Sequence, residues 1–464
     1  MGEKKTAIKG GGFSSKIGFV LAAAGSAVGL GNIWRFPYLA AQYGGGIFLL
    51  VYLILSVTFG FALMVTEIAI GRKTGKSVIG AYSDLSKKFA PLGWLAALVP
   101  VIIFPYYCVI GGWVLKYLVT FLTGSGAAAA AETVTVVDGA EKVVSFFDTF
   151  VSASPVEPGI FLAIYMGLTA VVVMLGVEKG IEKFSKFLMP VLIVITIVIS
   201  IYSCTLDGAL DGLLYYVTPN FENFSLKTVV AAMGQLFYSM SLAMGIMVTY
   251  GSYMRKDDSI EGSVHHIEIF DTGVAFLAGL MIVPAVFAFS GGDKSALNSG
   301  PSLMFETLPK VFDTMPGGHI MGVVFFLLVA LAALTSSISL METIVSIVCE
   351  KTKLKRIPVC LIVVGISFLI GMLSVLGYSS WSDVTLFGKQ FLDFFDFISN
   401  SIIMPIVALL TCILIGYVVK TKIVEDEVEI NGKFKSRKLY RVMVKFICPV
   451  FMIVIFVSSI IGYV

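Results

Sequence analysis

Residues 25–38 read GSAVGLGNIWRFPY and interrupt an apolar segment with an unusual mixture of residue types. Small residues such as these glycines let membrane helices approach closely, so helix packing accounts for part of the pattern. It does not account for Asn32, Arg35 and Pro37 in the same segment. An arginine at the centre of a membrane helix costs roughly 2.5–3.5 kcal/mol, and such a residue is usually paired or lines a wet cavity. The stretch therefore indicates a broken helix beside a polar site.

The composition of the whole chain indicates a membrane protein. Of the 464 residues, 57% are hydrophobic and 14% are charged. A soluble domain carries about 25% charged residues. The net charge of +3 is too small for a surface that binds nucleic acid. The six cysteines lack the close spacing of a metal or redox motif, so we expect free thiols.

About eleven apolar stretches are long enough to cross a bilayer as helices, which takes roughly 20 residues each. They are expected near 14–38, 44–70, 90–121, 159–176, 187–205, 226–254, 264–290, 319–349, 357–377, 389–419 and 440–462. Backbone groups in lipid must bond within the segment, so these stretches are helices and not open strands.

Lysine and arginine gather in alternate connections between these helices and predict the orientation. The basic connections contain Arg72, Lys73 and Lys76; Lys179, Lys183 and Lys186; Arg255 and Lys256; Lys351, Lys353, Lys355 and Arg356; and Lys433 to Arg441. Basic connections stay in the cytoplasm, which also places the lysine-rich N-terminus there. With an odd number of helices, Val464 lies outside. The N-terminus does not resemble a cleavable signal peptide, and we expect a multi-pass protein of the cell membrane.

A second stretch with polar and small residues interrupts the sixth apolar segment. It contains Gly234, Gln235, Ser239, Ser241, Ala243 and Gly245. The first and the sixth segments each begin a group of five helices, and matching interrupted helices in two halves indicate a transporter site. The predicted division is a cytoplasmic segment 1–13, a first five-helix repeat 14–206 with an outside loop 122–158, a second repeat 226–420, and a last helix 440–462.

Four motifs in this order resemble the neurotransmitter:sodium symporter family over nearly the whole chain. They are the block at 25–38 followed by Gly44-Gly-Gly46, QLFYSMSLAMG at 235–245, AALTSS at 332–337 and LDFFDF at 392–397. The resemblance implies the fold of the bacterial leucine transporter. That fold is an all-α polytopic membrane protein with about 11 helices, arranged as a 5+5 inverted repeat whose first and sixth helices are unwound.

Sodium is a hard cation that prefers oxygen ligands, and an unwound helix offers spare carbonyl oxygens for it. By resemblance, one sodium site consists of Ala27, Asn32, Ser239 and Asp271 with the substrate carboxylate. A second consists of Gly25, Val28, Ala332, Thr335 and Ser336. The alternative for the hydroxyls of Thr335 and Ser336 is a hydrogen bond to their own helix. Two Na⁺ ions and no organic cofactor are expected.

The substrate class follows from Gly29, because relatives that carry monoamines have an aspartate at this place. A glycine leaves room for a substrate carboxylate, and Tyr107 resembles the tyrosine that binds it. The substrate ammonium would meet Ser241 and carbonyls of the unwound segments. The implied pocket consists of Ser26, Ala27, Gly29, Gly31, Ile103, Tyr107, Tyr238, Ser239, Ser241, Met244, Ser336 and Leu340. It is mostly apolar, so a hydrophobic or aromatic α-amino acid is expected.

Further charged residues resemble parts that control access. Arg35 and Asp396 match an outer gate, and Tyr253 and Glu350 match an inner gate whose expected basic partner is Lys9. Glu67 resembles an acid that braces the broken sixth helix. Gly180 and Pro190 resemble the element that lets the fifth helix unwind, since both residue types weaken helices.

Asp271 stands where the family more often has asparagine, and we expect its charge to make chloride, which dependent relatives require, unnecessary here. The alternative is that Asp271 lies at a helix end in contact with water. Other acids and the histidines receive no role: Glu342 is unassigned, and His265, His266 and His319 are expected near helix ends. The predicted function is sodium-coupled import of a zwitterionic amino acid by alternating access. The alternative is a sodium- and amino-acid-binding sensor without flux. An enzyme is not expected, because metal, nucleophile and phosphate-loop motifs are missing from the sequence.

Overall fold

The computed structural model describes residues 12–137, 140–292, 297 and 302–462. The helices of the first half are α1 Lys16–Ala27, η1 Gly31–Arg35, α2 Phe36–Gln42, α3 Gly46–Leu55, η2 Ser56–Gly60, α4 Phe61–Thr74, α5 Val78–Leu85, η3 Lys87–Phe89, α6 Ala90–Leu122, α7 Gly126–Ala130, α8 Phe146–Ser152, α9 Val156–Met174, η4 Val177–Glu182, α10 Lys183–Cys204, α11 Ala209–Val217 and η5 Phe221–Asn223. Strands β1 Glu132–Val137 and β2 Ala140–Ser145 form an antiparallel hairpin.

The second half is also helical. Its elements are α12 Leu226–Ser239, α13 Ile246–Tyr253, α14 Ile260–Ser290, η7 Leu303–Thr307, α15 Leu308–Thr314, α16 Gly318–Thr352, α17 Arg356–Tyr378, α18 Phe391–Asp396, η8 Phe397–Ile403, α19 Met404–Ile413, η9 Leu414–Val418, α20 Lys422–Val428, η10 Glu429–Asn431, α21 Arg437–Val442, η11 Met443–Ile447 and α22 Cys448–Ile461.

The structure confirms the all-α membrane fold. Within the described residues, nine helices are long and apolar enough to cross a membrane, and the pair Lys16–Ala27 and Gly31–Gln42, bent by 55°, makes a tenth. The predicted sixth helix is the pair α12 and α13, which is interrupted at residues 240–245. The eleven predicted stretches therefore all coincide with helical segments, and the first and the sixth are the broken ones.

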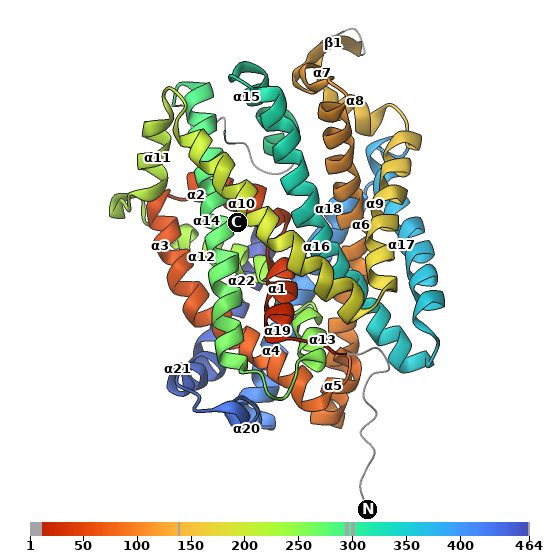
Figure 1. Ribbon diagram of the computed structural model, residues 1–464, viewed down its shortest axis with the longest axis vertical. Coiled ribbons are helices and arrows are strands. Elements are labelled where there is room, and N and C mark those ends of the chain that lie inside the picture. The colour runs from red at the N-terminus through yellow and green to blue at the C-terminus, as the bar shows by residue number, and fades with distance from the viewer. Residues whose placement is uncertain (1–11, 138–139, 293–296, 298–301, 463–464) are drawn as a thin grey trace, which may run out of the picture.

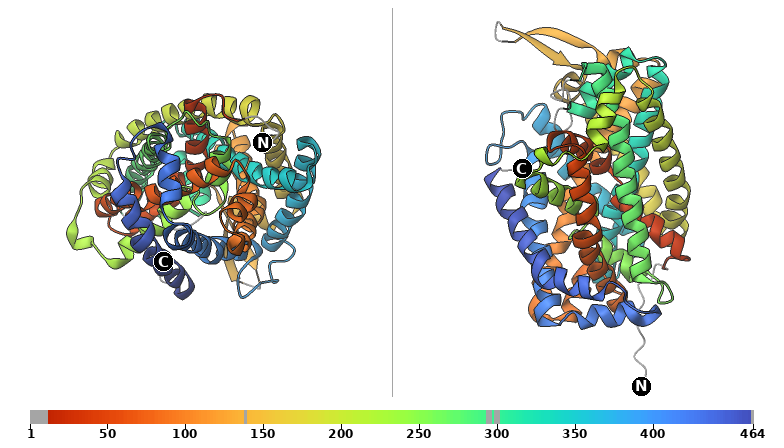
Figure 2. Two further views of the ribbon diagram at one scale, coloured as in Figure 1. Left: turned by 90° about the horizontal axis from the view of Figure 1, so that it is seen from below. Right: turned by 90° about the vertical axis from the view of Figure 1, so that its left-hand side faces the viewer.

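The long helices run side by side, and the broken helix α1 lies inside the bundle against α10, α14 and α16 (Figure 1). The β1–β2 hairpin projects from one end of the bundle, and α20 lies at the opposite end (Figures 1 and 2). We refer to these as the hairpin end and the α20 end. The bundle interior is filled by apolar and aromatic side chains, with a small set of buried polar residues between them.

Two connections between the long helices contain regular secondary structure. The basic connection predicted between the fourth and fifth helices is itself helical, because Gly176 at φ 86° reverses the chain and η4 begins at once. The predicted outside loop 122–158 contains α7, the hairpin and α8. Its last helix begins with a capping box, in which Ser145 and Asp148 satisfy each other's backbone N–H groups.

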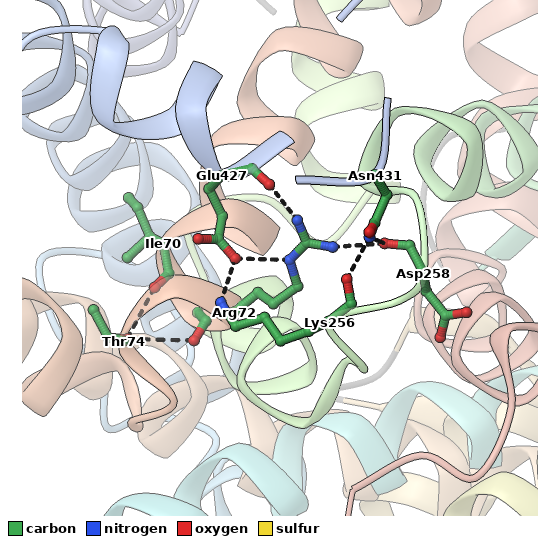
Figure 3. Close-up of polar contacts among 8 residues, drawn as sticks. Ile70, Arg72, Thr74, Lys256, Asp258, Glu427 and Asn431 are labelled. Atoms are coloured by element: carbon green, nitrogen blue, oxygen red, sulfur yellow. Dashed lines mark hydrogen bonds and ion pairs between the residues drawn. The ribbon is translucent and has the colours of Figure 1, made fainter. Parts of the chain in front are cut away.

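A buried arginine ties three segments together at the α20 end (Figure 3). Arg72, at the end of α4, is 3% exposed. Its Nε donates to Glu427 Oε1 at 2.8 Å and its Nη1 to the Asp258 carbonyl at 2.6 Å. Lys256 pairs with the same Glu427 oxygen at 2.5 Å, and Asn431 donates to the Asp258 carbonyl at 2.9 Å. The connection between α13 and α14 is thereby fixed to α4 and α20.

We expect Arg72→Ala to lower the free energy of unfolding by about 2–3 kcal/mol, since hydrogen bonds of charged groups contribute about 1.5–3 kcal/mol. The loss stays in this range because Lys256 still neutralises Glu427. Thermal unfolding of the purified protein in detergent measures it. The matched control is Lys76→Ala, which removes an exposed pair with Asp84 and should cost at most about 1 kcal/mol. Equal stability losses in the two variants would contradict this account.

Candidate functional site

Two breaks in the backbone face each other in the middle of the bundle. The first separates α1 from η1 at residues 28–30, and the second separates α12 from α13 at residues 240–245. In the second break Ser241 and Ala243 have φ values of 53° and 59°, in the left-handed region that side chains with a Cβ rarely adopt. Such strain persists only where surrounding contacts impose it, and it is common at functional sites.

Side chains from other helices hold the strained segment in place. The Ala243 N–H donates to Glu67 Oε1 at 2.7 Å, so the acid on α4 braces the second break as the resemblance implied. The Ser241 hydroxyl donates at 3.0 Å to the carbonyl of Ser26, in the last turn of α1 before the first break. Gln235 Nε2 donates to the Gly31 carbonyl at 2.9 Å. These side-chain bonds to backbone groups therefore fix the segments around the two breaks to each other and to α4.

A small cavity lies between the breaks, α6 and α16. All twelve residues of the implied substrate pocket line it, together with Leu30, Asn32 and Ile246. The Tyr107 hydroxyl is buried and makes no hydrogen bond within the described part of the chain. A Cβ placed on Gly29 would lie 3.1 Å from this hydroxyl and 2.6 Å from Ser336 Oγ. The glycine therefore leaves space directly in front of an unused donor.

The Asp271 carboxyl group of α14 is buried beside Asn32 and Ser239, two residues that line this cavity. The residue is 0% exposed. Asn32 Nδ2 and the Ser239 hydroxyl donate to Oδ1 at 2.8 and 2.7 Å, and the Tyr52 hydroxyl donates to Oδ2 at 3.1 Å. These three donors are neutral, and a buried carboxylate requires a compensating charge. Three of the four residues predicted for the first sodium site meet here, and Ala27 lines the adjoining cavity.

The residues predicted for the second sodium site lie where α1 packs on α16. A Cβ on Gly25 would lie 3.2 Å from Thr335 Cβ. The Ser336 hydroxyl donates to the Ser26 carbonyl at 3.1 Å and lies 3.5 Å from the carbonyls of Gly25 and Ala332. The Thr335 hydroxyl donates to the Ala332 carbonyl at 2.9 Å, which is the alternative bond to its own helix. Val28 is fully buried.

The two outer-gate residues do not form an ion pair, although both lie in the described part of the chain. Arg35 lies over the ring of Tyr238, with Cζ 5.6 Å from the ring centre. Asp396 Oδ1 accepts from the Tyr106 hydroxyl at 3.1 Å and from Asn400 Nδ2 at 2.5 Å. Tyr238 lines the cavity, so Arg35 packs on one of the side chains that form the cavity wall.

The residues predicted for the inner gate make contacts that were not predicted from the sequence. The Tyr253 hydroxyl donates to Glu342 Oε1 at 2.8 Å, and Arg356 pairs with the same carboxylate. Glu350 accepts from the Ser77 N–H at 2.5 Å, whereas its expected partner Lys9 lies outside the described residues. The only sequence signal for the Glu342–Arg356 pair was an unassigned acid within an apolar helix.

The N-terminal segment is attached to the start of the fifth helix, where Gly180 and Pro190 were singled out. Glu182 of η4 accepts from the Ser14 N–H at 2.6 Å and from the Ser15 hydroxyl at 2.9 Å. The ring of Phe13 packs edge-on against Tyr250, and its N–H donates to the Tyr253 carbonyl at 3.1 Å. The segment 13–15 therefore contacts both the start of the fifth helix and Tyr253.

Comparison with known proteins identifies similar chains over nearly the full length. The model of the sodium:neurotransmitter symporter family matches residues 11–136 and 155–464. An uncharacterized sodium-dependent transporter of Bacillus subtilis, YhdH, is 35% identical over 97% of each chain. One of Haemophilus influenzae is 31% identical over 96% of this chain and 97% of the other. The human sodium- and chloride-dependent GABA transporter 2 is 24% identical over 99% of this chain and 82% of that protein.

The structural comparison agrees with the sequence comparison. The crystal structure of MhsT in complex with L-phenylalanine superimposes with a TM-score of 0.84 and 35% identity, covering 97% of this chain and 99% of that chain.

Proposed function

The chain belongs to the sodium:neurotransmitter symporter family, and from that premise we propose that it imports a zwitterionic α-amino acid by sodium-coupled symport. One observation carries the proposal. A fully buried aspartate with only neutral hydrogen-bond donors lies beside a cavity that ends in an unused tyrosine hydroxyl. A sodium ion at Asp271 and a substrate carboxylate between that ion and Tyr107 would satisfy both groups.

Two sodium ions are part of this proposal. The first would be bound by Ala27, Asn32, Ser239 and Asp271 with the substrate carboxylate. The second would be bound where Gly25 and Val28 face Ala332, Thr335 and Ser336. In the second site the Thr335 hydroxyl would exchange its bond to Ala332 for the ion, which needs only a rotation of its side chain. Oxygen ligands of this kind suit Na⁺.

The substrate is proposed to be hydrophobic or aromatic. Ile103, Met244 and Leu340 form the apolar part of the cavity lining, and methionine adapts to ligands of different shape. A similar protein has been crystallised in complex with L-phenylalanine, which is a ligand of this class. Ser241 and the open carbonyls would receive the ammonium group.

Transport is proposed to proceed by alternating access, with the α20 end in the cytoplasm. The basic residues Arg72, Lys256 and Arg441 all lie in or beside segments at this end, as the positive-inside rule requires. Closing of an Arg35–Asp396 pair would seal the hairpin end, and opening of Tyr253 from Glu342 would release the substrate. The repeats 14–206 and 226–420 would move against each other around the fixed site.

The protein reconstituted into liposomes tests the proposal directly. Labelled L-phenylalanine should accumulate above its outside concentration when an inward sodium gradient is imposed, and it should not when potassium replaces sodium. Competition by each of the twenty amino acids would then define the substrate. Sodium-dependent binding of the amino acid without accumulation would overturn symport. It would favour the alternative of a sodium- and amino-acid-binding sensor without flux.

Removal of chloride is expected to leave uptake unchanged. Asp271 supplies a fixed negative charge beside the first sodium site, so no mobile anion is needed there. The measurement replaces chloride by gluconate on both sides of the liposomes. The matched variant is Asp271→Asn, which retains the shape but not the charge and should make uptake depend on chloride. A collapse of wild-type uptake in gluconate would contradict the role given to Asp271.

A further inference from the structure

A large groove opens on the outside of the bundle between α3, α11 and α14. Its volume is about 700 Å³. Most of its walls are apolar side chains that face away from the bundle, such as Leu53, Val57 and Ile269. Two ionisable side chains of α14, His265 and Glu268, interrupt this apolar lining. Ionisable residues within a membrane helix are costly and call for a specific role.

Glu268 is buried in the groove wall, and only one of its oxygens is bonded. The residue is 3% exposed. Oε2 lies 3.0 Å from His265 Nδ1, whereas Oε1 is buried and has no hydrogen-bond partner among the described residues. The His265 side chain is 45% exposed and stacks on Phe61, with ring centres 4.8 Å apart. The pair thus joins a buried proton acceptor to a group that reaches the surface.

These two residues belong to a stripe of ionisable groups on one face of α14. Glu261, His265, Glu268 and Asp271 follow one another at intervals of three or four residues, which places them above one another along about 15 Å of helix. Glu261, nearest the α20 end, accepts from the N–H groups of Lys435 and Ser436 at 3.0 and 2.9 Å. The stripe therefore leads from that end to the proposed sodium site.

Tyr52 separates the groove from Asp271. It lines the groove, and its hydroxyl donates to Asp271 Oδ2 at 3.1 Å. The other ionisable groups near the pair are Glu261 on α14 and Lys16 of α1, whose Nζ lies beside Gly262. Glu268 therefore lies between two carboxylates on its own helix, with His265 as its hydrogen-bond partner.

We propose that His265 and Glu268 form a proton-binding site that opens to the cytoplasm and opposes sodium binding at Asp271. A proton from water would pass to His265 and on to the Glu268 carboxylate, forming a neutral carboxylic acid. When sodium binds at Asp271, the same proton would leave through His265 to water. Glu268 lies about one helical turn from Asp271, so its negative charge favours sodium there. A proton that neutralises Glu268 therefore lowers the affinity for sodium, and bound sodium lowers the affinity for the proton by the same factor.

This site deepens the proposed symport, on which it rests, by adding a control of sodium release. Acidification of the cytoplasmic side would load Glu268 with a proton, weaken sodium at Asp271 and favour discharge of the first sodium ion. His265 is the half-exposed group to which Glu268 is bonded, so the effect should depend on that side chain as well as on Glu268.

The test measures binding of radioactive sodium to the full-length protein in detergent between about pH 8 and about pH 6, the range in which a histidine–carboxylate pair can change its protonation. The wild-type affinity should fall about tenfold over this range, a typical coupling between two sites. Glu268→Gln and His265→Gln should lose most of this dependence. A pH-sensitive dye in weak buffer should report proton release on sodium addition in the wild type and less in both variants.

His266→Gln is the matched control, because this neighbouring histidine directs its Nδ1 to the Gly262 carbonyl of its own helix and should leave the pH dependence intact. An identical pH dependence in wild type and in a folded Glu268→Gln or His265→Gln variant would overturn the proposal. If the Glu268→Gln variant does not fold, the pH dependence of sodium binding in the His265→Gln variant decides the proposal. Absence of sodium binding at every pH in the wild type would instead contradict the proposed symport.

Discussion

Asp271→Ala is expected to abolish sodium-driven amino acid uptake and to weaken sodium binding by about a hundredfold or more. Removing one partner of a buried, hydrogen-bonded charge pair costs about 3–5 kcal/mol, and every 1.4 kcal/mol corresponds to a factor of about ten in affinity. Asn32, Ser239 and Tyr52 would also lose their common acceptor. Binding of radioactive sodium and uptake into liposomes measure the two effects.

Asp84→Ala serves as the control for this experiment, since Asp84 is a half-exposed acid that pairs with Lys76 outside the site. It should leave sodium binding unchanged. The variant Asp271→Asn distinguishes a lost charge from a lost fold, because it is nearly isosteric and should bind sodium in the presence of chloride. Sodium affinity of wild-type strength in a folded Asp271→Ala protein would exclude Asp271 as a ligand.

Gly29→Ala is expected to block substrate binding, with a loss of affinity of roughly ten- to hundredfold, because hydrogen bonds to a charged group contribute about 1.5–3 kcal/mol. The new methyl group would lie 2.6 Å from Ser336 Oγ and 3.1 Å from the Tyr107 hydroxyl, so one of them must move. It would also fill the space proposed for the substrate carboxylate. Competition binding with labelled L-phenylalanine at saturating sodium provides the measurement.

Gly234→Ala is the matched control, since a Cβ at this glycine of α12 meets no atom within 4 Å. It should bind substrate like the wild type and be slightly more stable, because alanine favours a helix over glycine by about 1 kcal/mol. Equal substrate affinities in Gly29→Ala and Gly234→Ala would show that the carboxylate lies elsewhere.

The family resemblance, carried by motifs within the apolar stretches, predicted much of the candidate site. The implied pocket residues, from Ser26 to Leu340, all line one cavity, and Glu67 reaches the second break. Several apolar stretches contain glycines, hydroxyl side chains and an asparagine. These residues indicate that the backbone there does not form a regular helix. The residue types alone therefore indicate the interrupted helices. The order of the four motifs along the chain then indicates the family.

Contacts between distant segments were predicted poorly. Arg356 was counted among the basic loop residues, yet it turns inward and pairs with Glu342. Glu350 accepts from the Ser77 backbone, a contact that was not predicted, and its expected partner Lys9 lies outside the described residues. A charge pattern indicates which side of a membrane a segment occupies, but the partner of a long side chain depends on which helix ends lie next to it.

The sequence by itself determined the positions of the long apolar helices, the two interrupted ones and the presence of polar residues between them. A helix long and apolar enough to cross a membrane is specified by its own residues, and so is a break caused by small and polar residues within it. The tertiary structure alone decided that Arg35 rests on Tyr238 apart from Asp396, and that Arg72 joins Glu427. It also decided that Glu268 lies in the wall of a groove on the outside of the bundle, with one oxygen unbonded among the described residues. These are choices among several possible partners, and only the packing of the helices brings one of them within bonding distance.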